Sequence, residues 1–185
     1  MDFKDAADYF RAYASDPAAC AIFPVQMIAD LRGVSRGAII GMIDTGKLKE
    51  IKIGKVRYVR ASSYIDLLEE QERRDQQVLK FLEGVAARRE VVTYEPVMSL
   101  VGLRWQTPAD RNTIGAILGR ISEKTSEKHG ILLSVLVHRK TPGKTRPGKG
   151  FFELAEYLGY DWEDEDAFTD EETEKVWSFH SKNKP

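Results

Sequence analysis

Residues 24–60 read PVQMIADLRGVSRGAIIGMIDTGKLKEIKIGKVRYVR, and the first half of this stretch carries two short helical patterns. Pro24 suits a helix start, because its missing N–H would be unpaired in the first turn anyway. Gly33 predicts a tight turn after that helix, since glycine tolerates a positive φ. Ser35 is a good N-cap for a second helix, which we expect over residues 35–45.

The second half of the stretch alternates apolar and polar residues in two runs, 48–53 and 56–60. Gly54-Lys55 separates these runs by two residues, which is typical of a β-hairpin. Helix, turn, helix and hairpin follow one another in a winged helix-turn-helix. We therefore expect such a module in the first part of the chain.

These residues also resemble the winged helices of excisionases and MerR-type regulators, over about residues 22–68. The match lies in order and spacing, and the positions that carry it are Gly33, Ser35, Gly46, Leu48, Gly54 and Arg57. The resemblance implies that helix 35–45 faces a DNA major groove and that the hairpin lies along the backbone. It also points to a protein of a mobile element or phage.

The charge of this module agrees with DNA binding. Between Arg32 and Arg60, eight basic residues stand against only two acidic ones, a balance that favours phosphate contacts. The alternative is a solvated basic face on a winged helix that binds protein. The expected reading face offers Arg36, Gly37, Ile40, Gly41 and Asp44, and of these only Arg36 is an obvious candidate for reading base edges. The predicted DNA-binding residues are Ser35, Arg36, Lys47, Lys52, Lys55, Arg57 and Arg60.

The composition is that of an ordinary soluble globular protein, with 185 residues, 42% apolar and 31% charged. No apolar run approaches the length of a transmembrane helix, and the acidic N-terminal residues do not resemble a signal peptide. Cys20 is the single cysteine, which excludes an internal disulfide and suits the cytoplasm.

Residues 2–14 predict an amphipathic helix that packs on the module as an extra wall or serves as a partner-binding arm. Ser62 should cap a long helix that reaches Arg89. Because its middle is polar all round, this helix either connects two packed bodies or forms a homodimer through residues 62–89. The predicted fold is α+β and mostly helical, with two winged-helix-like modules joined by a long helix. The predicted domains are residues 1–70, a helical connector over 71–90, and 91–185.

The second part of the chain again mixes helical and β-prone patterns. Its expected elements are a β-prone run at 91–94, a helix at 95–101, a helix from Thr107 to about Lys128, a buried strand at 131–138, a helix at 151–158 and a last helix capped by Thr169.

About residues 91–151 resemble the DNA-binding domain of alkylguanine DNA alkyltransferases. The stretches that carry this resemblance are VVTYEPVMSLVG (91–102), ILLSVLVHRK (131–140) and PGKG (147–150). It implies a second DNA-binding module. Val137 occupies the position of the alkyl-accepting cysteine in that family, so we expect no alkyl transfer.

Five basic residues lie among glycines and prolines at 139–149, an arrangement that favours contact with a nucleic-acid backbone over a merely solvated loop. Tyr94 is either a core aromatic or a phosphate contact, and His138 is expected to be a strand-end histidine rather than a catalytic base. The predicted DNA-binding residues of this part are Tyr94, Arg139, Lys140, Lys144, Arg146 and Lys149.

Residues 153–174 hold eleven acidic residues and no basic one, yet large apolar residues lie on both sides of them. A disordered acidic tail would not need such anchors, so this segment should fold back on the second module. Its carboxylates then either solubilise the surface, compete with DNA for the basic loop or bind a protein partner.

The sequence contains no recognisable enzyme motif, metal-ligand spacing or cofactor signature. The expected function is that of a cytoplasmic protein that binds double-stranded DNA, as a transcription regulator or an architectural factor. The alternative is a protein-interaction adaptor, and an enzyme that acts on nucleic acid is the third reading.

Overall fold

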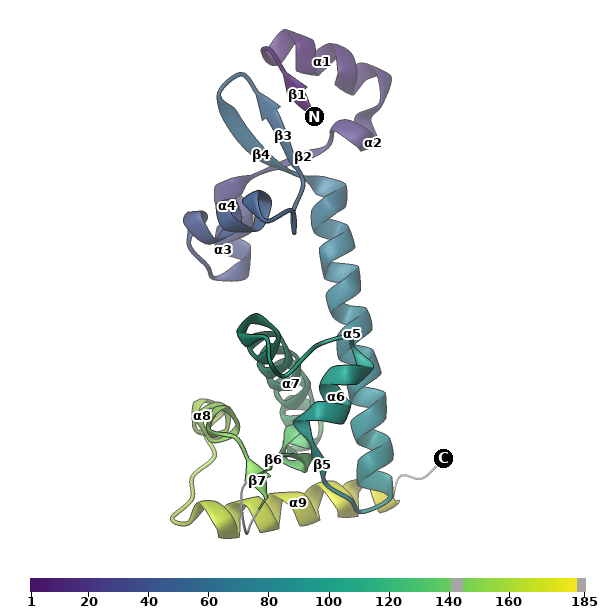
Figure 1. Ribbon diagram of the computed structural model, residues 1–185, viewed down its shortest axis with the longest axis vertical. Helices are drawn as coiled ribbons and strands as arrows, with labels where there is room; N and C mark the ends of the chain where they lie inside the picture. Colours follow the sequence, from purple (N-terminus) through teal and green to yellow (C-terminus); the bar gives the residue numbers. More distant parts are fainter. Residues whose placement is uncertain (141–144, 183–185) are drawn as a thin grey trace. The chain divides into compact units, whose positions relative to one another are not determined.

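The computed structural model describes residues 1–140 and 145–182 and shows an α+β chain that is mostly helical, with small mixed sheets (Figure 1). The chain divides into two compact units, unit 1 (Met1–Glu72) and unit 2 (Arg73–Pro185). In the described part of the chain, no helix combines the length and the apolar character that crossing a membrane requires.

Unit 1 is built on a sheet with the strand order β1-β3-β4-β2. Its elements are β1 (Asp2–Phe3), α1 (Ala6–Ser15), α2 (Pro17–Cys20), β2 (Ile22–Pro24), α3 (Val25–Arg32), α4 (Arg36–Asp44), β3 (Glu50–Ile53) and β4 (Val56–Arg60). Ile28, Ile39, Leu48 and Val59 are at most 1% exposed and form the centre of its core. The core therefore joins both central helices to the hairpin.

The two predicted short helices, the tight turn between them and the hairpin are present in unit 1. Gly33 has φ = 62° at the end of α3, as the tight turn requires. The Ala38 N–H donates to Ser35 Oγ over 3.2 Å, so Ser35 is the N-cap of α4. In the hairpin, Ile53 pairs with Val56 across the two-residue turn.

The prediction of a helix over residues 2–14 was wrong at its start. Asp5 accepts from the Asp8 N–H and caps α1, which begins only at Ala6. The residues before this cap are extended, and Phe3 pairs in parallel with Ile53 on the outer edge of β3. The N-terminal segment is thus part of the sheet, because the open edge of the hairpin offers it backbone partners.

The long helix α5 (Ala61–Ala87) contributes to both cores: Tyr64 packs in unit 1, while Val78 and Leu82 pack in unit 2. Ser62 lies inside the helix rather than at its cap, because β4 ends at Arg60 and α5 begins directly at Ala61. Most of the predicted connector, residues 71–90, belongs to unit 2.

Unit 2 contains a sheet with the order β5-β6-β7 beside several helices. Its elements after α5 are β5 (Val92–Thr93), α6 (Tyr94–Leu100), α7 (Pro108–His129), the 3-10 helix η1 (Leu133–Leu136), β6 (Val137–Arg139), β7 (Arg146–Pro147), α8 (Lys149–Tyr157) and α9 (Glu165–Lys182). Its core includes Leu82, Met98, Ile114, Leu132 and Leu136, each at most 1% exposed.

The prediction of a buried strand over residues 131–138 was right about burial and largely wrong about conformation. The Leu132 N–H donates to Glu172 Oε1 over 2.7 Å, and the Ser134 N–H donates to Ser122 Oγ over 3.0 Å. These side chains satisfy backbone groups that a strand would have paired. Only Val137–Arg139 is a strand, between β5 and β7.

Two further expectations concern the acidic C-terminal segment. Thr169 does not cap α9, which starts at Glu165; Asp164 accepts from the Ala167 N–H near its start, and the Thr169 hydroxyl donates to the Glu165 carbonyl. The segment does fold back on unit 2, because Phe168 and Val176 of α9 are buried in its core.

Candidate nucleic-acid interface

Helix α4 divides cleanly into a buried and an exposed face. Ile39 and Ile43 enter the core of unit 1, while Arg36, Gly37 and Gly41 are exposed. A Cβ at Gly41 would meet nothing within 4 Å, so this part of the surface of α4 is open and the helix backbone is accessible there. Arg36 is the first residue of the helix, and it stands at the end where the helix dipole favours anions.

The hairpin presents its cations in three different settings. Lys55 lies in the turn, is exposed and forms no ion pair with any described residue. Lys52 on β3 contacts the Glu50 carboxylate at 3.4 Å. Its register partner on β1 is Asp2, which further reduces the positive potential at this edge. Lys55 is therefore the hairpin cation most available to a phosphate.

Arg57 differs from the other predicted DNA contacts because it is already paired twice. Its guanidinium donates to Asp44 of α4 over 2.8 Å and to the Glu50 carboxylate of β3. The hydrogen bond to Asp44, together with that to Glu50, raises the pKa of Arg57. The side chain thus ties α4 to the hairpin and fixes their mutual position.

The remaining predicted residues of unit 1 lie on either side of this arrangement. Lys47 is exposed in the turn after α4 and forms no ion pair with a described residue. Arg60 ends β4, and its Nε is buried without a hydrogen-bond partner in the described structure. Ser35 acts through its cap. The sequence pattern did not indicate Lys4, which is exposed. Lys4 lies beside the hairpin turn, because its carbonyl oxygen would be 3.6 Å from a Cβ placed on Gly54.

In unit 2 the predicted cations that the structure describes lie in different surroundings. Arg146 contacts Glu165 at 3.3 Å and Lys149 contacts Glu153 at 2.7 Å, so acidic residues of the C-terminal segment partly neutralise them. Lys144 lies outside the described residues. Arg139 and Lys140 line a pocket with Tyr94.

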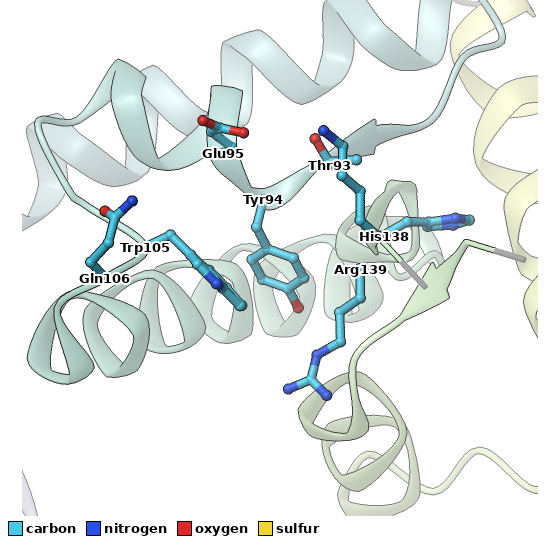
Figure 2. A pocket seen from close by; sticks show the side chains of 8 residues that line it. Thr93, Tyr94, Glu95, Trp105, Gln106, His138 and Arg139 are labelled. Atoms are coloured by element: carbon cyan, nitrogen blue, oxygen red, sulfur yellow. The ribbon is translucent and has the colours of Figure 1, made fainter. Parts of the chain in front are cut away.

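This pocket has a volume of about 460 Å³ and lies between the start of α6, the loop before α7 and the end of β6. Figure 2 shows the ring of Tyr94 between the Trp105 ring and the Arg139 side chain, while Glu95 points away from them. Burial raises the pKa of the Tyr94 phenol, although the Arg139 charge opposes this, so the phenol stays protonated at neutral pH. Tyr94 is partly buried and also packs against the core.

Trp105 and Gln106 also line this pocket, and the sequence-based prediction missed both. The sequence did offer one signal. Trp105 lies in the polar run LRWQTPADR (103–111), which has no helical or strand periodicity that would place a large aromatic side chain in a core. Trp105 is 41% exposed, unlike the aromatic residues of the core.

His138 follows Val137 on β6 and is only 7% exposed. Its ring points away from Tyr94 and Arg139 (Figure 2), and its Nδ1 lies 3.4 Å from the Thr145 hydroxyl. Burial lowers the pKa of the imidazole. These contacts describe a histidine buried in the strand.

Within residues 1–140 and 145–182, no group of three or more histidine, cysteine or carboxylate side chains could hold a metal ion. Comparison of the chain with protein-family models, with curated proteins and with solved structures finds no match in any of the three.

Proposed function

We propose that the protein binds double-stranded DNA through unit 1, which acts as a winged helix-turn-helix. The observation that carries the proposal is the pairing pattern of the charges. Asp44 and Glu50 are the only acidic residues between Arg32 and Arg60, and Arg57 engages both. The exposed cations Arg36, Lys47 and Lys55 are left without an internal counter-ion in the described structure.

Arg57 acts as a positioning residue in this proposal. In winged-helix binding, one helix enters the major groove while the wing follows the backbone, so the two must hold a fixed spacing. The contacts of Arg57 to Asp44 and Glu50 supply this spacing. Lys55 then contacts phosphate from the turn of the hairpin.

The exposed face of α4 favours close approach over sequence reading. Gly37 and Gly41 let the helix backbone lie deep in the groove, but they offer no groups that distinguish bases. Arg36 is the one long side chain at the start of this helix that can donate to a guanine edge. We therefore propose binding with modest sequence preference, which suits an architectural factor or a regulator that binds with a partner, of a mobile element or phage.

The test is a salt series of binding to random and genomic duplex DNA with the full chain. Each phosphate contact contributes about 0.9 to the slope of log K against log salt concentration. A steep negative slope with a small difference between the two DNA pools supports the proposal. Affinity below the usual non-specific range, about 10⁻⁴ to 10⁻⁶ M, at physiological salt would reject it.

A protein-interaction adaptor is the second candidate, and one observation favours it. Phe10 and Tyr13 of α1 are 65% and 42% exposed and line a pocket of about 350 Å³ with Tyr9 and Ile22. Exposed aromatic side chains around a concavity are typical of protein-binding surfaces. A pull-down partner lost in a Phe10→Ala variant that still binds DNA would assign this role to α1.

A further inference from the structure

The pocket in unit 2 has an aromatic wall whose position is fixed in advance. The Tyr94 and Trp105 rings lie 5.6 Å apart at 46°. Arg111 donates to the Trp105 carbonyl over 2.7 Å, and its guanidinium carbon is 5.7 Å from the centre of the Trp105 ring. Asp110 accepts from the Arg104 N–H over 2.9 Å, which fixes the start of the same loop. An exposed aromatic ring that is held in place offers a stacking surface at low entropic cost.

The same pocket has a cationic wall, Arg139 and Lys140, and neither residue forms an ion pair with a described residue, Glu95 of the pocket lining included. Arg139 and Arg146 are register partners on β6 and β7, and like charges directly opposite destabilise a sheet. Glu165 relieves this repulsion at Arg146. Arg139 has no carboxylate partner among the described residues, and Lys140 follows it at the rim of the pocket. An anionic ligand at Arg139 would supply the missing charge.

Gly148 explains how the two walls come together. It is buried at the start of α8, and a Cβ there would lie 3.0 Å from Arg139 Nε and 3.2 Å from the Tyr94 hydroxyl oxygen. A Cβ at this position would require these side chains to shift by a few tenths of an ångström. The absence of a side chain therefore leaves room for the guanidinium beside the aromatic pair.

We propose that this pocket binds a nucleoside monophosphate unit. The base stacks on the Trp105–Tyr94 wall, and Arg139 and Lys140 hold the phosphate. Its volume, about 460 Å³, falls within the usual range for small-ligand sites, about 300 to 1,000 Å³. Stacking on an aromatic ring beside cations is also how proteins hold unpaired nucleotides in a strand. The ligand is thus either a free nucleotide or a nucleotide of single-stranded nucleic acid.

This site is separate from the proposed duplex-binding surface, since all of its residues belong to unit 2. The test uses isothermal titration calorimetry on the full chain with thymidine monophosphate and with a short single-stranded oligothymidylate. Binding of the monophosphate alone identifies a free nucleotide as ligand. Tighter binding of the oligomer, with competition by the monophosphate, identifies a strand. Either result supports the proposal.

Two variants and their matched controls decide whether the binding occurs in this pocket. Arg139→Gln should weaken binding by about 10- to 100-fold, as expected for loss of a charge-assisted hydrogen bond. Arg88→Gln makes the same charge change elsewhere in unit 2 and should stay within about twofold. Trp105→Ala should weaken binding by about 5- to 100-fold. Tyr157→Ala, which removes an 81% exposed ring elsewhere in unit 2, should have no effect.

Three results would overturn the proposal: no heat with either probe, equal losses in a variant and its control, or inorganic phosphate that competes as well as the nucleotide. Circular dichroism of each variant shows that unit 2 is still folded. Duplex binding measured on the same samples keeps a failure here distinct from a failure of the function proposed for unit 1.

Discussion

Lys55 and Arg57 of the β3–β4 hairpin have different surroundings, so we expect Lys55 to contact DNA and Arg57 to stabilise the fold. Lys55 has no internal partner in the described structure, so a Lys55→Gln change should leave stability unchanged. The same change should reduce the magnitude of the salt slope of duplex binding by about 0.9, the value of one phosphate contact. Lys80→Gln, an exposed lysine on α5, is the matched control. Equal slopes in both variants would exclude Lys55 as a phosphate contact.

Arg57→Gln should act first on stability, because it removes both contacts between the guanidinium and its carboxylates. We expect a loss of about 0.5 to 1 kcal/mol in the free energy of unfolding of unit 1, measured by urea titration. Duplex affinity should fall as well, since the spacing of α4 and the hairpin loosens. Weaker DNA binding with no loss of stability would instead make Arg57 a direct phosphate ligand.

The ion pairs of Glu50 with Arg57 and Lys52 should make the stability of unit 1 depend on pH in the acidic range. Burial acts to raise the pKa of Glu50, but the Arg57 and Lys52 cations outweigh it and hold the pKa below its ordinary value of 4.5. The folded state therefore binds the proton more weakly than the unfolded state, so this contribution is complete above pH 4.5 and is lost as the pH falls through the lowered pKa. Glu50→Gln should flatten this part of the curve of stability against pH. An unchanged curve would contradict this assignment.

At the scale of elements, the buried carboxylate of Glu172 supports the segment that replaces the expected strand. It is 0% exposed, accepts from the Leu132 N–H and contacts Lys175 at 3.2 Å. Glu172→Ala should lower the stability of unit 2 by about 1 to 3 kcal/mol, because a buried backbone donor is left unpaired. Glu171→Ala, at an exposed neighbouring position, is the control, and similar losses in both would disprove this role.

Local signals predicted the elements that depend on a single residue type. Gly33, the Ser35 cap and the Gly54-Lys55 turn each act within a few residues, so the sequence located α3, α4 and the hairpin. The errors arose where a distant partner decides the conformation. Phe3 pairs with the open edge of β3, and the Leu132 N–H donates to the carboxylate of Glu172, forty positions away.

The candidate sites show the same limit. Charge patterning indicated the cations, but it could not show that Asp44 and Glu50 would engage Arg57 or that Glu165 would engage Arg146. The pocket of unit 2 joins residues from three separate segments, so the lone Trp105 in its polar run could not be connected to Tyr94 or Arg139 from the sequence. Ile65 and Leu68 are 50% and 40% exposed on α5, so the apolar residues of this helix do not all enter a core.

At the scale of the whole molecule, the two units have separate proposed ligands. In a double variant of Lys55→Gln and Arg139→Gln, the duplex affinity should equal that of Lys55→Gln alone and the nucleotide affinity that of Arg139→Gln alone, each within about 0.5 kcal/mol. Titrating each ligand in the presence of the other tests this. A change in one affinity caused by the substitution in the other unit would show that the sites are coupled.

Nuclear magnetic resonance can show directly whether unit 1 binds duplex DNA, as proposed. A titration of the labelled full chain with duplex DNA reports on every backbone amide. We expect the largest shifts on the first turn of α4, around Arg36, and on the hairpin turn at Gly54 and Lys55, with smaller shifts in unit 2. Shifts confined to unit 2, or to the exposed aromatic residues of α1, would contradict this proposal.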